Sequence, residues 1–322
     1  MNALKTKFVS VVIPILNEED NIMPLYMKLK KDLDPTGMEY EIIMVDDGSS
    51  DKSFSVLKNL NGQDKKVKVI KFTKNFGQTS AMMAGIQLAS APVVVTMDGD
   101  QQNDSADIPI LIGELEKGFD LVCGWRKDRQ DVFWRRKVPS IFANKLISKF
   151  SGVHLHDYGC SLKAFKAKTI KAIRLYGELH RFIPALIARE GGKISEIVVR
   201  HHPRSQGISK YGMERVLKVL LDIFLLKFLS GYYTRPIHFF GKFGFMCFFL
   251  GAVFGFITIF QHYFTGLLLA DLFPLVILSM LFLLFGMQSI LIGLVAEISI
   301  RIYYETKEKA IYVVEQIIRE ES

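Results

Sequence analysis

Short apolar runs alternate with amphipathic segments through the first half of the chain. The apolar runs are rich in Val and Ile, which is typical of buried β-strands. The predicted strands are Phe8–Ile13, Tyr40–Val45, Val67–Phe72, Pro92–Met97 and Phe119–Cys123. Helical spacing is found between them, near Glu18–Lys31, Asp51–Asn59, Gln78–Ala89 and Ile108–Lys117. This alternation predicts a mostly parallel, doubly wound α/β sheet.

The last third of the chain has a different pattern. Phe243–Ala270 and Leu272–Ala296 contain no charged residue, and each is longer than the ~20 residues that a helix needs to cross a bilayer. Asp271 lies between them, close to Pro274. We therefore predict a hairpin of two transmembrane helices. The alternative is a pair of buried helices in a soluble core.

Charged flanks predict the orientation of this hairpin. Arg235 and Lys242 precede or begin the first span, and Arg301, Lys307 and Lys309 follow the second. The connecting turn contains no Lys or Arg. By the positive-inside rule, both termini and the N-terminal domain are expected in the cytoplasm, in an integral protein of the inner membrane.

A further helix, Met213–Ser230, is expected between the two parts. Most of its charged residues share one face, as in helices that lie in the membrane interface. An ordinary core-packing helix is the alternative. The expected domains are a catalytic domain at 1–212, a juxtamembrane helix at 213–236, a hairpin at 237–302 and a cytoplasmic, helical tail at 303–322.

Composition changes this outline little. The net charge of +8 fits a surface held against anionic lipid headgroups, and the two spans make nucleic acid an unlikely partner for a basic chain. Cys123, Cys160 and Cys247 lie far apart without C-x-x-C spacing. They predict a reducing compartment and no cysteine metal cluster.

The polar chemistry lies just after the predicted strands, in "PILNEED", "DDGSSD", "TKNFGQ" and "DGDQQND". Ligands of open α/β sheets bind at this edge. Asp98 and Asp100 repel each other unless a cation lies between them, and Mg²⁺ or Mn²⁺ suits such a D-x-D turn. Gly99 is expected to let the backbone between them approach a ligand closely. By itself the motif is common in surface loops, and its placement at a strand end is what makes it informative.

Dinucleotide redox chemistry loses its main sequence signal, and a P-loop site is excluded. No G-x-G-x-x-G follows the first strand, and the chain has no P-loop sequence. Carboxylates suit ribose hydroxyls and base N–H groups, but they repel phosphate unless a metal intervenes. We expect a nucleoside diphosphate, bridged by a cation, in a pocket edged by Glu18, Glu19, Asp46, Asp47, Asp98 and Asp100.

Six motifs together carry a resemblance to a known family: "VVIPILNEEDN", "IIMVDDGSSD", "NFGQTSAMMAG", "VVTMDGDQQN", "DYGCSLKAFK" and "HHPRSQGISKY". The chain resembles family 2 glycosyltransferases of the Rossmann-like GT-A fold. More narrowly, it resembles polyprenyl-phosphate hexosyltransferases, the dolichyl-phosphate mannose synthases and the bactoprenol glucosyltransferases. The latter also end in two transmembrane helices, so the resemblance covers the whole chain. The mannose synthases have "DADLQHPP" here, and the prolines are missing from this chain.

The resemblance implies a role for individual residues on the donor side. Pro14, Leu16 and Glu18 would line the nucleotide base, and Asp46 and Asp47 would bind the nucleoside. The metal and the donor diphosphate would be held by Asp98, Asp100 and Gln102.

Other residues are implied at the acceptor and the reacting centre. Arg126, Arg135 and Lys210 resemble the basic residues that contact phosphates, and Arg204 lies in the same acceptor-side loop as Lys210. Asp157 resembles the acid beside the reacting centre. A phosphate acceptor is largely ionised at neutral pH, so Asp157 is expected to orient groups more than to act as a base. The catalytic set is thus Asp157, Asp100 and Arg126.

The expected function is an inverting, metal-dependent transfer of a hexose to a polyprenyl phosphate such as undecaprenyl phosphate, for glycosylation of the cell envelope. Glucose from UDP-glucose is favoured because of the two-span C-terminus, and mannose from GDP-mannose is the alternative. A non-catalytic sugar-nucleotide sensor or membrane scaffold is the alternative of another class. A homo-oligomer is expected, because small membrane hairpins often associate.

Overall fold

A computed structural model describes residues 6, 8–127, 147–148, 152–173, 175, 179–203, 236–305 and 314–318. The chain divides into two compact units, Met1–Leu226 with Ala310–Ser322, and Lys227–Lys309. The predicted interfacial helix at 213–230 lies outside the described residues, as do Arg135, Arg204 and Lys210.

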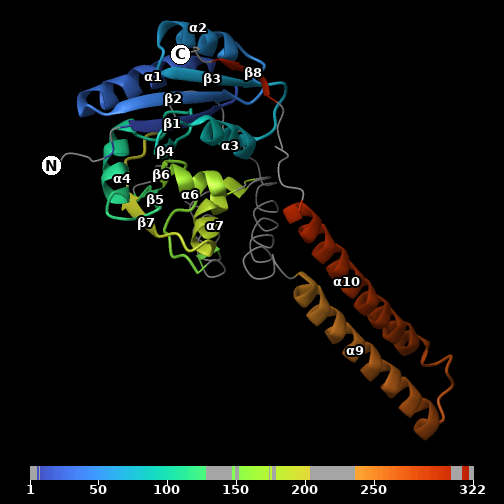
Figure 1. Ribbon diagram of the computed structural model, residues 1–322. Helices are drawn as coiled ribbons and strands as arrows, with labels where there is room; N and C mark the ends of the chain where they lie inside the picture. The colour runs from blue at the N-terminus through green and yellow to red at the C-terminus, as the bar shows by residue number, and fades with distance from the viewer. Residues whose placement is uncertain are drawn as a thin grey trace. The chain divides into compact units, whose positions relative to one another are not determined.

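The first unit is built on a sheet in which the described residues form eight strands, in the order β7-β5-β6-β4-β1-β2-β3-β8 (Figure 1). All five predicted strands are present. The strands are β1 (Phe8–Ile15), β2 (Glu39–Asp46), β3 (Val67–Phe72), β4 (Val93–Thr96), β5 (Leu121–Trp125), β6 (Lys163–Lys166), β7 (Ile194–Val198) and β8 (Val314–Ile318).

Most of these strands are parallel, as predicted. β1 pairs in parallel with both β2 and β4, β2 pairs with β3, and β5 pairs with β7. β6 is antiparallel to β4 and to β5, and β8 is antiparallel to β3. The sheet is therefore mixed, with β6 and β8 running against the other strands.

Helices cover both faces of the sheet. The four predicted helices correspond to α1, α2, α3 and α4. The described helices of this unit are α1 (Glu19–Leu33), η1 (Asp34–Thr36), α2 (Ser53–Gln63), α3 (Gln78–Leu88), η2 (Ser105–Asp107), α4 (Ile108–Leu115), α6 (Ala167–Ala172), η4 (Leu179–Phe182) and α7 (Ile183–Arg189).

The core follows from the period-two alternation of the strands. Val9, Val11 and Ile13 of β1 face a core formed with α1, α2 and α4. Val12 faces the other side and lies so close to Gly85 of α3 that a Cβ there would come within 2.4 Å of its Cγ1. Both faces of β1 are thus buried, which explains its unbroken apolar sequence.

The C-terminal tail differs from the sequence prediction. The expected continuation of the second span as a helix extends to Glu305, but Val314–Ile318 forms strand β8 on the edge of β3. The sequence "VEQII" is rich in β-branched residues, and the open edge of β3 offers unpaired backbone groups. These two features favour a strand over a polar helix.

The second unit is a hairpin of α9 (Pro236–Thr265) and α10 (Phe273–Glu305). Ile237–Thr265 and Phe273–Ser299 are long and apolar enough to cross a membrane, and only 22% and 11% of their most apolar windows are buried among the described residues. Core helices of a soluble protein would be largely covered. The predicted turn lies between the helices, around Asp271.

Small residues bring the two helices together. Gly244 and Gly286 face each other so closely that a Cβ on either would lie within 2.9 Å of the carbonyl oxygen of the other. The Oγ of Ser279 donates to the carbonyl oxygen of Gly251 at 2.8 Å, and that of Ser289 to the carbonyl oxygen of Phe240 at 2.8 Å. Close backbone approach and hydroxyl bonds of this kind stabilise helix pairs in membranes.

Candidate active site

The polar loops after the parallel strands meet at one edge of the sheet, as predicted. Ile15 at the end of β1 is in register with Asp46 at the end of β2, and Asp46 is in register with Lys71 of β3. Val12 of β1 is in register with Thr96, the last residue of β4. The carboxyl ends of these four strands therefore form one continuous edge.

The turn at Asp98–Asp100 is fixed by close packing. A Cβ on Gly99 would lie 2.7 Å from Cδ1 of Ile15 and 3.3 Å from the carbonyl oxygen of Pro14. Gly99 therefore keeps the turn against the end of β1, so its space is filled by protein and not by a ligand. Gln101, two residues after Gly99, has a backbone φ of 60°. This left-handed conformation is uncommon for a residue with a side chain and is often found at functional sites.

The side chains of Asp98, Asp100 and Gln102 are half-buried and remain accessible to solvent. Oδ1 of Asp98 accepts from Nε2 of Gln78 at 2.8 Å, and Oδ1 of Asp100 accepts from the backbone N–H of Gln102 at 3.2 Å. Gln78 is the first residue of α3, so the turn is tied to the start of that helix.

This donor set fits a hard divalent cation. Two carboxylates and an amide oxygen are the ligand types that Mg²⁺ and Mn²⁺ prefer. Among the described residues, no three His, Cys, Asp or Glu side chains form a ready metal cage. Mg²⁺ usually keeps waters and takes substrate phosphates as ligands, which an incomplete protein shell allows.

The cysteines play no part in such a shell. Cys123, Cys160 and Cys247 are buried, and none of them forms a disulfide bond. Burial raises the pKa of Cys123 to about 12 and that of Cys160 to about 11. Both remain neutral thiols at physiological pH.

Asp46 is fully buried at the end of β2. Its Oδ1 accepts from the backbone N–H of Ser49 at 3.1 Å, whereas Oδ2 has no hydrogen-bond partner within the described part of the chain. Burial raises the pKa of Asp46, and the hydrogen bonds from Ser49 oppose that shift. A buried carboxylate oxygen without a hydrogen-bond partner lowers the stability of the fold. Groups that carry such a cost are frequent at ligand-binding sites.

Asp47 has a different environment. Its two carboxylate oxygens accept from the backbone N–H groups of Phe76 and Gly77, at 2.7 and 3.0 Å. Burial raises its pKa, and these two amides oppose the shift. Asp47 therefore holds the loop between β3 and α3 beside the site.

Glu18 is linked to the D-x-D turn through two amide side chains. Nδ2 of Asn21 donates to Oε2 of Glu18 at 2.5 Å, and Nε2 of Gln101 donates to Oδ1 of Asn21 at 2.9 Å. Pro14 and Leu16 are half-buried at the end of β1. The structure thus brings the predicted base-side residues to the same edge as the turn.

Arg126 and Asp157 form a buried ion pair. Nε of Arg126 lies 2.7 Å from Oδ2 of Asp157, and Nη2 lies 3.0 Å from Oδ1, with side-chain exposures of 10% and 6%. Burial alone would lower the pKa of Arg126, but Asp157 holds it above its usual value. Oδ1 of Asp157 also accepts from the backbone N–H of Gly159 at 3.1 Å. A carboxylate with its oxygens so occupied orients the guanidinium and is a poor base.

Glu196 is a site residue that the sequence analysis missed. Its carboxylate, on β7, accepts from the backbone N–H of Asp157 at 2.9 Å and from that of His156 at 3.0 Å. His156 also stacks on Trp125, with ring centroids 4.0 Å apart. An acid in the middle of the apolar run "ISEIV" was the available signal, because a half-buried carboxylate requires partners.

A second missed element is η4. Nδ1 of His180 lies 2.7 Å from Oγ1 of Thr79, which follows Gln78 at the start of α3. The polar pair in "LHRFIP", ahead of an apolar helix, was the available signal. The start of α3 thus contacts the D-x-D turn through Gln78, and it contacts a segment about a hundred residues later in the chain through Thr79.

Comparisons with known proteins agree with this geometry. Residues 10–174 match the model of "Glycosyl transferase family 2". The chain belongs to glycosyltransferase family 2. The matched residues include the D-x-D turn and the Arg126–Asp157 pair.

Curated relatives extend the similarity to the rest of this glycosyltransferase. It is 40% identical to a dodecaprenyl-phosphate galacturonate synthase of Rhizobium johnstonii, over 97% of this chain and 94% of the relative. It is 33% identical to an undecaprenyl-phosphate 4-deoxy-4-formamido-L-arabinose transferase of Edwardsiella ictaluri, over 99% of this chain and 97% of the relative. The family 2 enzyme described here therefore transfers a sugar to a polyprenyl phosphate.

Solved structures support the fold. Glucosyl-3-phosphoglycerate synthase from Mycobacterium tuberculosis, in complex with Mn²⁺, UDP and glucosyl-3-phosphoglycerate, matches with a TM-score of 0.53 and 19% identity, over 67% of this chain and 80% of that one. The predicted GT-A-like fold of the glycosyltransferase domain is confirmed.

Proposed function

We propose that this glycosyltransferase transfers a UDP-linked sugar, with galacturonate as the first candidate, to undecaprenyl phosphate at the cytoplasmic face of a membrane. The observation that carries the proposal is the accessible D-x-D turn at the strand edge, in a chain 40% identical to a galacturonate synthase. The Edwardsiella ictaluri relative, which is named for formamido-arabinose, is 33% identical.

Glucose, favoured by the sequence analysis, loses its main support. That expectation rested on the two-span C-terminus. The alignments with the galacturonate and formamido-arabinose enzymes cover 97% and 99% of this chain, so they include most or all of the hairpin. A feature shared by enzymes for several sugars does not select one of them.

Asp98, Asp100 and Gln102 are the residues that would hold a divalent cation. When bound, the cation would stabilise negative charge on the leaving diphosphate. The chain supplies an incomplete shell, and phosphate oxygens of the donor and water would complete it. Mg²⁺ and Mn²⁺ fit equally well, and Mn²⁺ is the first probe to use because the similar mycobacterial structure contains it.

The transfer itself exchanges one bond at the sugar C1 atom. An oxygen of the acceptor phosphate attacks C1, the bond from C1 to the diphosphate breaks, and UDP leaves with the bonding electron pair. Attack from the opposite face inverts C1. The acceptor is a phosphate monoester with a second pKa of about 6, so it is already ionised and needs little general-base help. Asp157 accordingly serves to hold Arg126, whose two bonds to Asp157 use two of its five N–H groups.

The hairpin would retain the enzyme on the membrane that contains its acceptor. The absence of Lys and Arg from the turn between α9 and α10 supports an orientation with both termini in the cytoplasm. The apolar hairpin also supports a homo-oligomer, through packing between copies in the bilayer. Arg135, Arg204 and Lys210 remain the proposed phosphate contacts.

A donor panel tests the proposal. Purified full-length enzyme in lipid nanodiscs is given undecaprenyl phosphate, Mn²⁺ and one labelled donor at a time: UDP-galacturonate, UDP-4-deoxy-4-formamido-L-arabinose, UDP-glucose or GDP-mannose. The expected result is lipid-extractable label from UDP-galacturonate at a rate well above the others. Preferential label from another donor would overturn the galacturonate assignment, and equal label with EDTA would overturn the metal assignment.

A further inference from the structure

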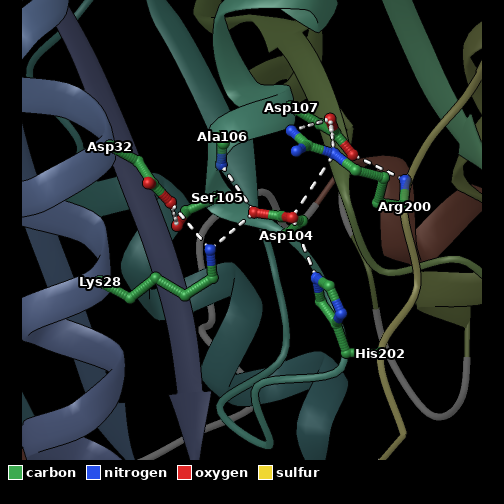
Figure 2. Close-up of polar contacts among 8 residues, drawn as sticks. All are labelled: Lys28, Asp32, Asp104, Ser105, Ala106, Asp107, Arg200 and His202. Carbon is green, nitrogen blue, oxygen red and sulfur yellow. Dashed lines mark hydrogen bonds and ion pairs between the residues drawn. The ribbon is translucent and has the colours of Figure 1, made fainter.

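A cluster of polar side chains joins the segment that follows the D-x-D turn to the end of β7. It consists of Lys28, Asp104, Asp107, Arg200 and His202 (Figure 2), and we refer to it as the Asp104 cluster. Lys28 comes from α1, Asp104 and Asp107 lie at the two ends of η2, and the other two residues follow β7. The cluster therefore connects three parts of the chain that are far apart in sequence.

Asp104 is the centre of the cluster. Its carboxylate is 6% exposed and lies between Lys28 on one side and Arg200 and His202 on the other (Figure 2). Oδ1 lies 2.7 Å from Nζ of Lys28, whereas Oδ2 lies 2.9 Å from Nε2 of His202 and 3.4 Å from Nε of Arg200. Oδ1 also accepts from the backbone N–H of Ala106 at 3.1 Å. Because two cationic side chains already surround it, Asp104 is an anchor and not a ligand for a metal ion.

Arg200 and Lys28 add further links around η2. Nε and Nη2 of Arg200 donate to Oδ1 of Asp107 at 2.9 and 2.7 Å, and the backbone N–H of Arg200 donates to Oδ2 at 2.7 Å. Nζ of Lys28 lies 3.0 Å from Oδ2 of Asp32, which also accepts from Oγ of Ser105. The start of η2 is thus fixed both to α1 and to the segment after β7.

The cluster reaches Gln102 through the backbone. The backbone N–H of His202 donates to the carbonyl oxygen of Gln102 at 2.9 Å, and Asn103 forms an antiparallel bridge with His201. Asp104 contacts the side chain of His202, and His202 in turn holds Gln102 through its main chain. The short antiparallel pairing beside the D-x-D turn is therefore supported by a buried side-chain contact.

On its other side, Gln102 is tied to the D-x-D turn itself. Its backbone N–H donates to Oδ1 of Asp100 at 3.2 Å. Gln101, between these two residues, has a φ of 60°, and a left-handed residue of this kind persists only where its surroundings hold it. Nε2 of Gln101 donates to Oδ1 of Asn21 on α1 at 2.9 Å. If the contacts behind Gln102 were lost, the backbone of this turn would relax and would carry Asp100 with it.

We propose that Asp104 and His202 are positioning residues for the cation: acting through Gln102, they set where the ligand groups of Gln102 and Asp100 lie. Neither Asp104 nor His202 would touch the cation. The proposal rests on the proposed function, which assigns Asp98, Asp100 and Gln102 to the cation. Removal of groups that orient metal ligands from behind lowers metal affinity by roughly 10- to 100-fold.

Two variants test this role. Asp104→Asn removes the negative charge and keeps the shape of the side chain. Its partners Lys28 and Arg200 are 33% and 56% exposed, so water solvates them in the variant, which is expected to fold. His202→Ala removes one contact at a side chain that is 47% exposed. We expect the Kd for Mn²⁺ in the presence of UDP to rise about tenfold in the first variant and about threefold in the second.

Asp64→Asn is the matched control. The Asp64 side chain is 15% exposed, accepts from Oη of Tyr26 at 2.6 Å and lies 3.8 Å from Nζ of Lys30. It follows α2 and belongs to none of the segments that the cluster joins. This variant is expected to lower thermal stability without changing the affinity for Mn²⁺ or for UDP.

The experiment measures three quantities on the full-length enzyme in nanodiscs: the Kd for Mn²⁺ at saturating UDP, from the EPR signal of protein-bound Mn²⁺, the Kd for UDP in EDTA, and the Tm. The expected result is a raised Mn²⁺ Kd in both cluster variants, with a metal-free UDP Kd within about twofold of wild type. A merely structural role would lower the Tm alone, as in the control.

An unchanged Mn²⁺ Kd in either cluster variant, or an equal loss of metal-free UDP affinity, would overturn the proposal. A wild-type enzyme that binds no Mn²⁺ in the presence of UDP would instead count against the metal assignment of the proposed function. The two failures are therefore distinguishable.

Discussion

Asp46 and Asp47 are neighbours in sequence but have different partners. Asp47 is satisfied by the backbone N–H groups of Phe76 and Gly77, whereas Oδ2 of Asp46 has no partner among the described residues. An unsatisfied buried acceptor lowers stability unless a ligand donates to it. Of the pair, Asp46 is therefore the better candidate for a direct contact with the nucleoside.

Asp46→Asn is predicted to raise stability and to weaken nucleotide binding. Because burial raises the folded-state pKa of Asp46, its ionised form destabilises the fold. That penalty is absent below the ordinary Asp pKa of about 3.9 and grows as pH rises through the raised folded value. At pH 7 we expect a gain of about 0.5–2 kcal/mol, which shrinks toward pH 4, and a UDP affinity lower by about tenfold.

Thermal unfolding from pH 4 to 8 and UDP titration with Mn²⁺ check this result. Asp51→Asn is a control of opposite sign. Burial opposes the shift, yet hydrogen bonds from Ser53 and Glu19 hold the pKa of Asp51 below its usual value. The Asp51→Asn variant should therefore be less stable than wild type at pH 7. A less stable Asp46→Asn variant with unchanged UDP affinity would contradict the interpretation.

Asp157→Asn is predicted to be strongly destabilising. It leaves the guanidinium of Arg126, 10% exposed, without its counter-charge, and breaking a buried pair on one side costs about 3–5 kcal/mol. Glu114→Gln is the control, because its partner Lys117 is 68% exposed and such pairs contribute about 0–1 kcal/mol. Equal losses of unfolding free energy in the two variants would argue against a structural role for the Arg126–Asp157 pair.

At the scale of elements, the regular part of the fold could be predicted from sequence. Five strands and four helices of the first half have continuous apolar or helical periodicity, and all of them are present. β6 was missed because it has only four residues, "KAFK", with a Lys at each end, and because it lies inside the motif "DYGCSLKAFK". β8 was missed because a strand added to a distant edge depends on β3, some 240 residues earlier, and not on local pattern.

The candidate site, like the fold, could be predicted only in part from the sequence. The rule that ligands bind at the carboxyl ends of parallel strands was enough to locate Asp46, Asp98 and Asp100. The pairing of Arg126 with Asp157, and of Asp104 with a histidine 98 residues later, could not be predicted. Ion pairs between distant loops leave no periodic signal in a single sequence.

The hairpin provides a prediction for the pairing of α9 and α10. Gly286→Leu places a side chain where a Cβ already meets the carbonyl oxygen of Gly244 at 2.9 Å and the ring of Phe248 at 3.2 Å. The helices must separate, so we expect a Tm in detergent lower by several degrees, the equivalent of about 1–3 kcal/mol. Gly241→Leu is the control, because a Cβ there meets no atom within 4 Å. A Gly286→Leu variant as stable as this control would refute the close helix pairing.

At the scale of the whole molecule, one chain combines a GT-A-like domain with an apolar helical hairpin, and the catalytic sheet includes a strand from beyond the hairpin. This organisation suits an enzyme whose donor is soluble and whose acceptor is a lipid. The proposed donor, metal and orientation all depend on one centre, the turn at Asp98–Asp100. That centre can be tested without knowledge of the oligomeric state.

The most direct test is the initial rate of label transfer to undecaprenyl phosphate by Asp98→Asn and Asp100→Asn, compared with wild type and with Asp64→Asn. Each site variant loses a cation ligand at the leaving diphosphate, so we predict a rate at least ~100-fold lower, as for other removed transition-state contacts. The Asp64→Asn control should stay within about twofold of wild type. Transfer at the wild-type rate by either site variant would contradict the assignment of this turn as the catalytic centre.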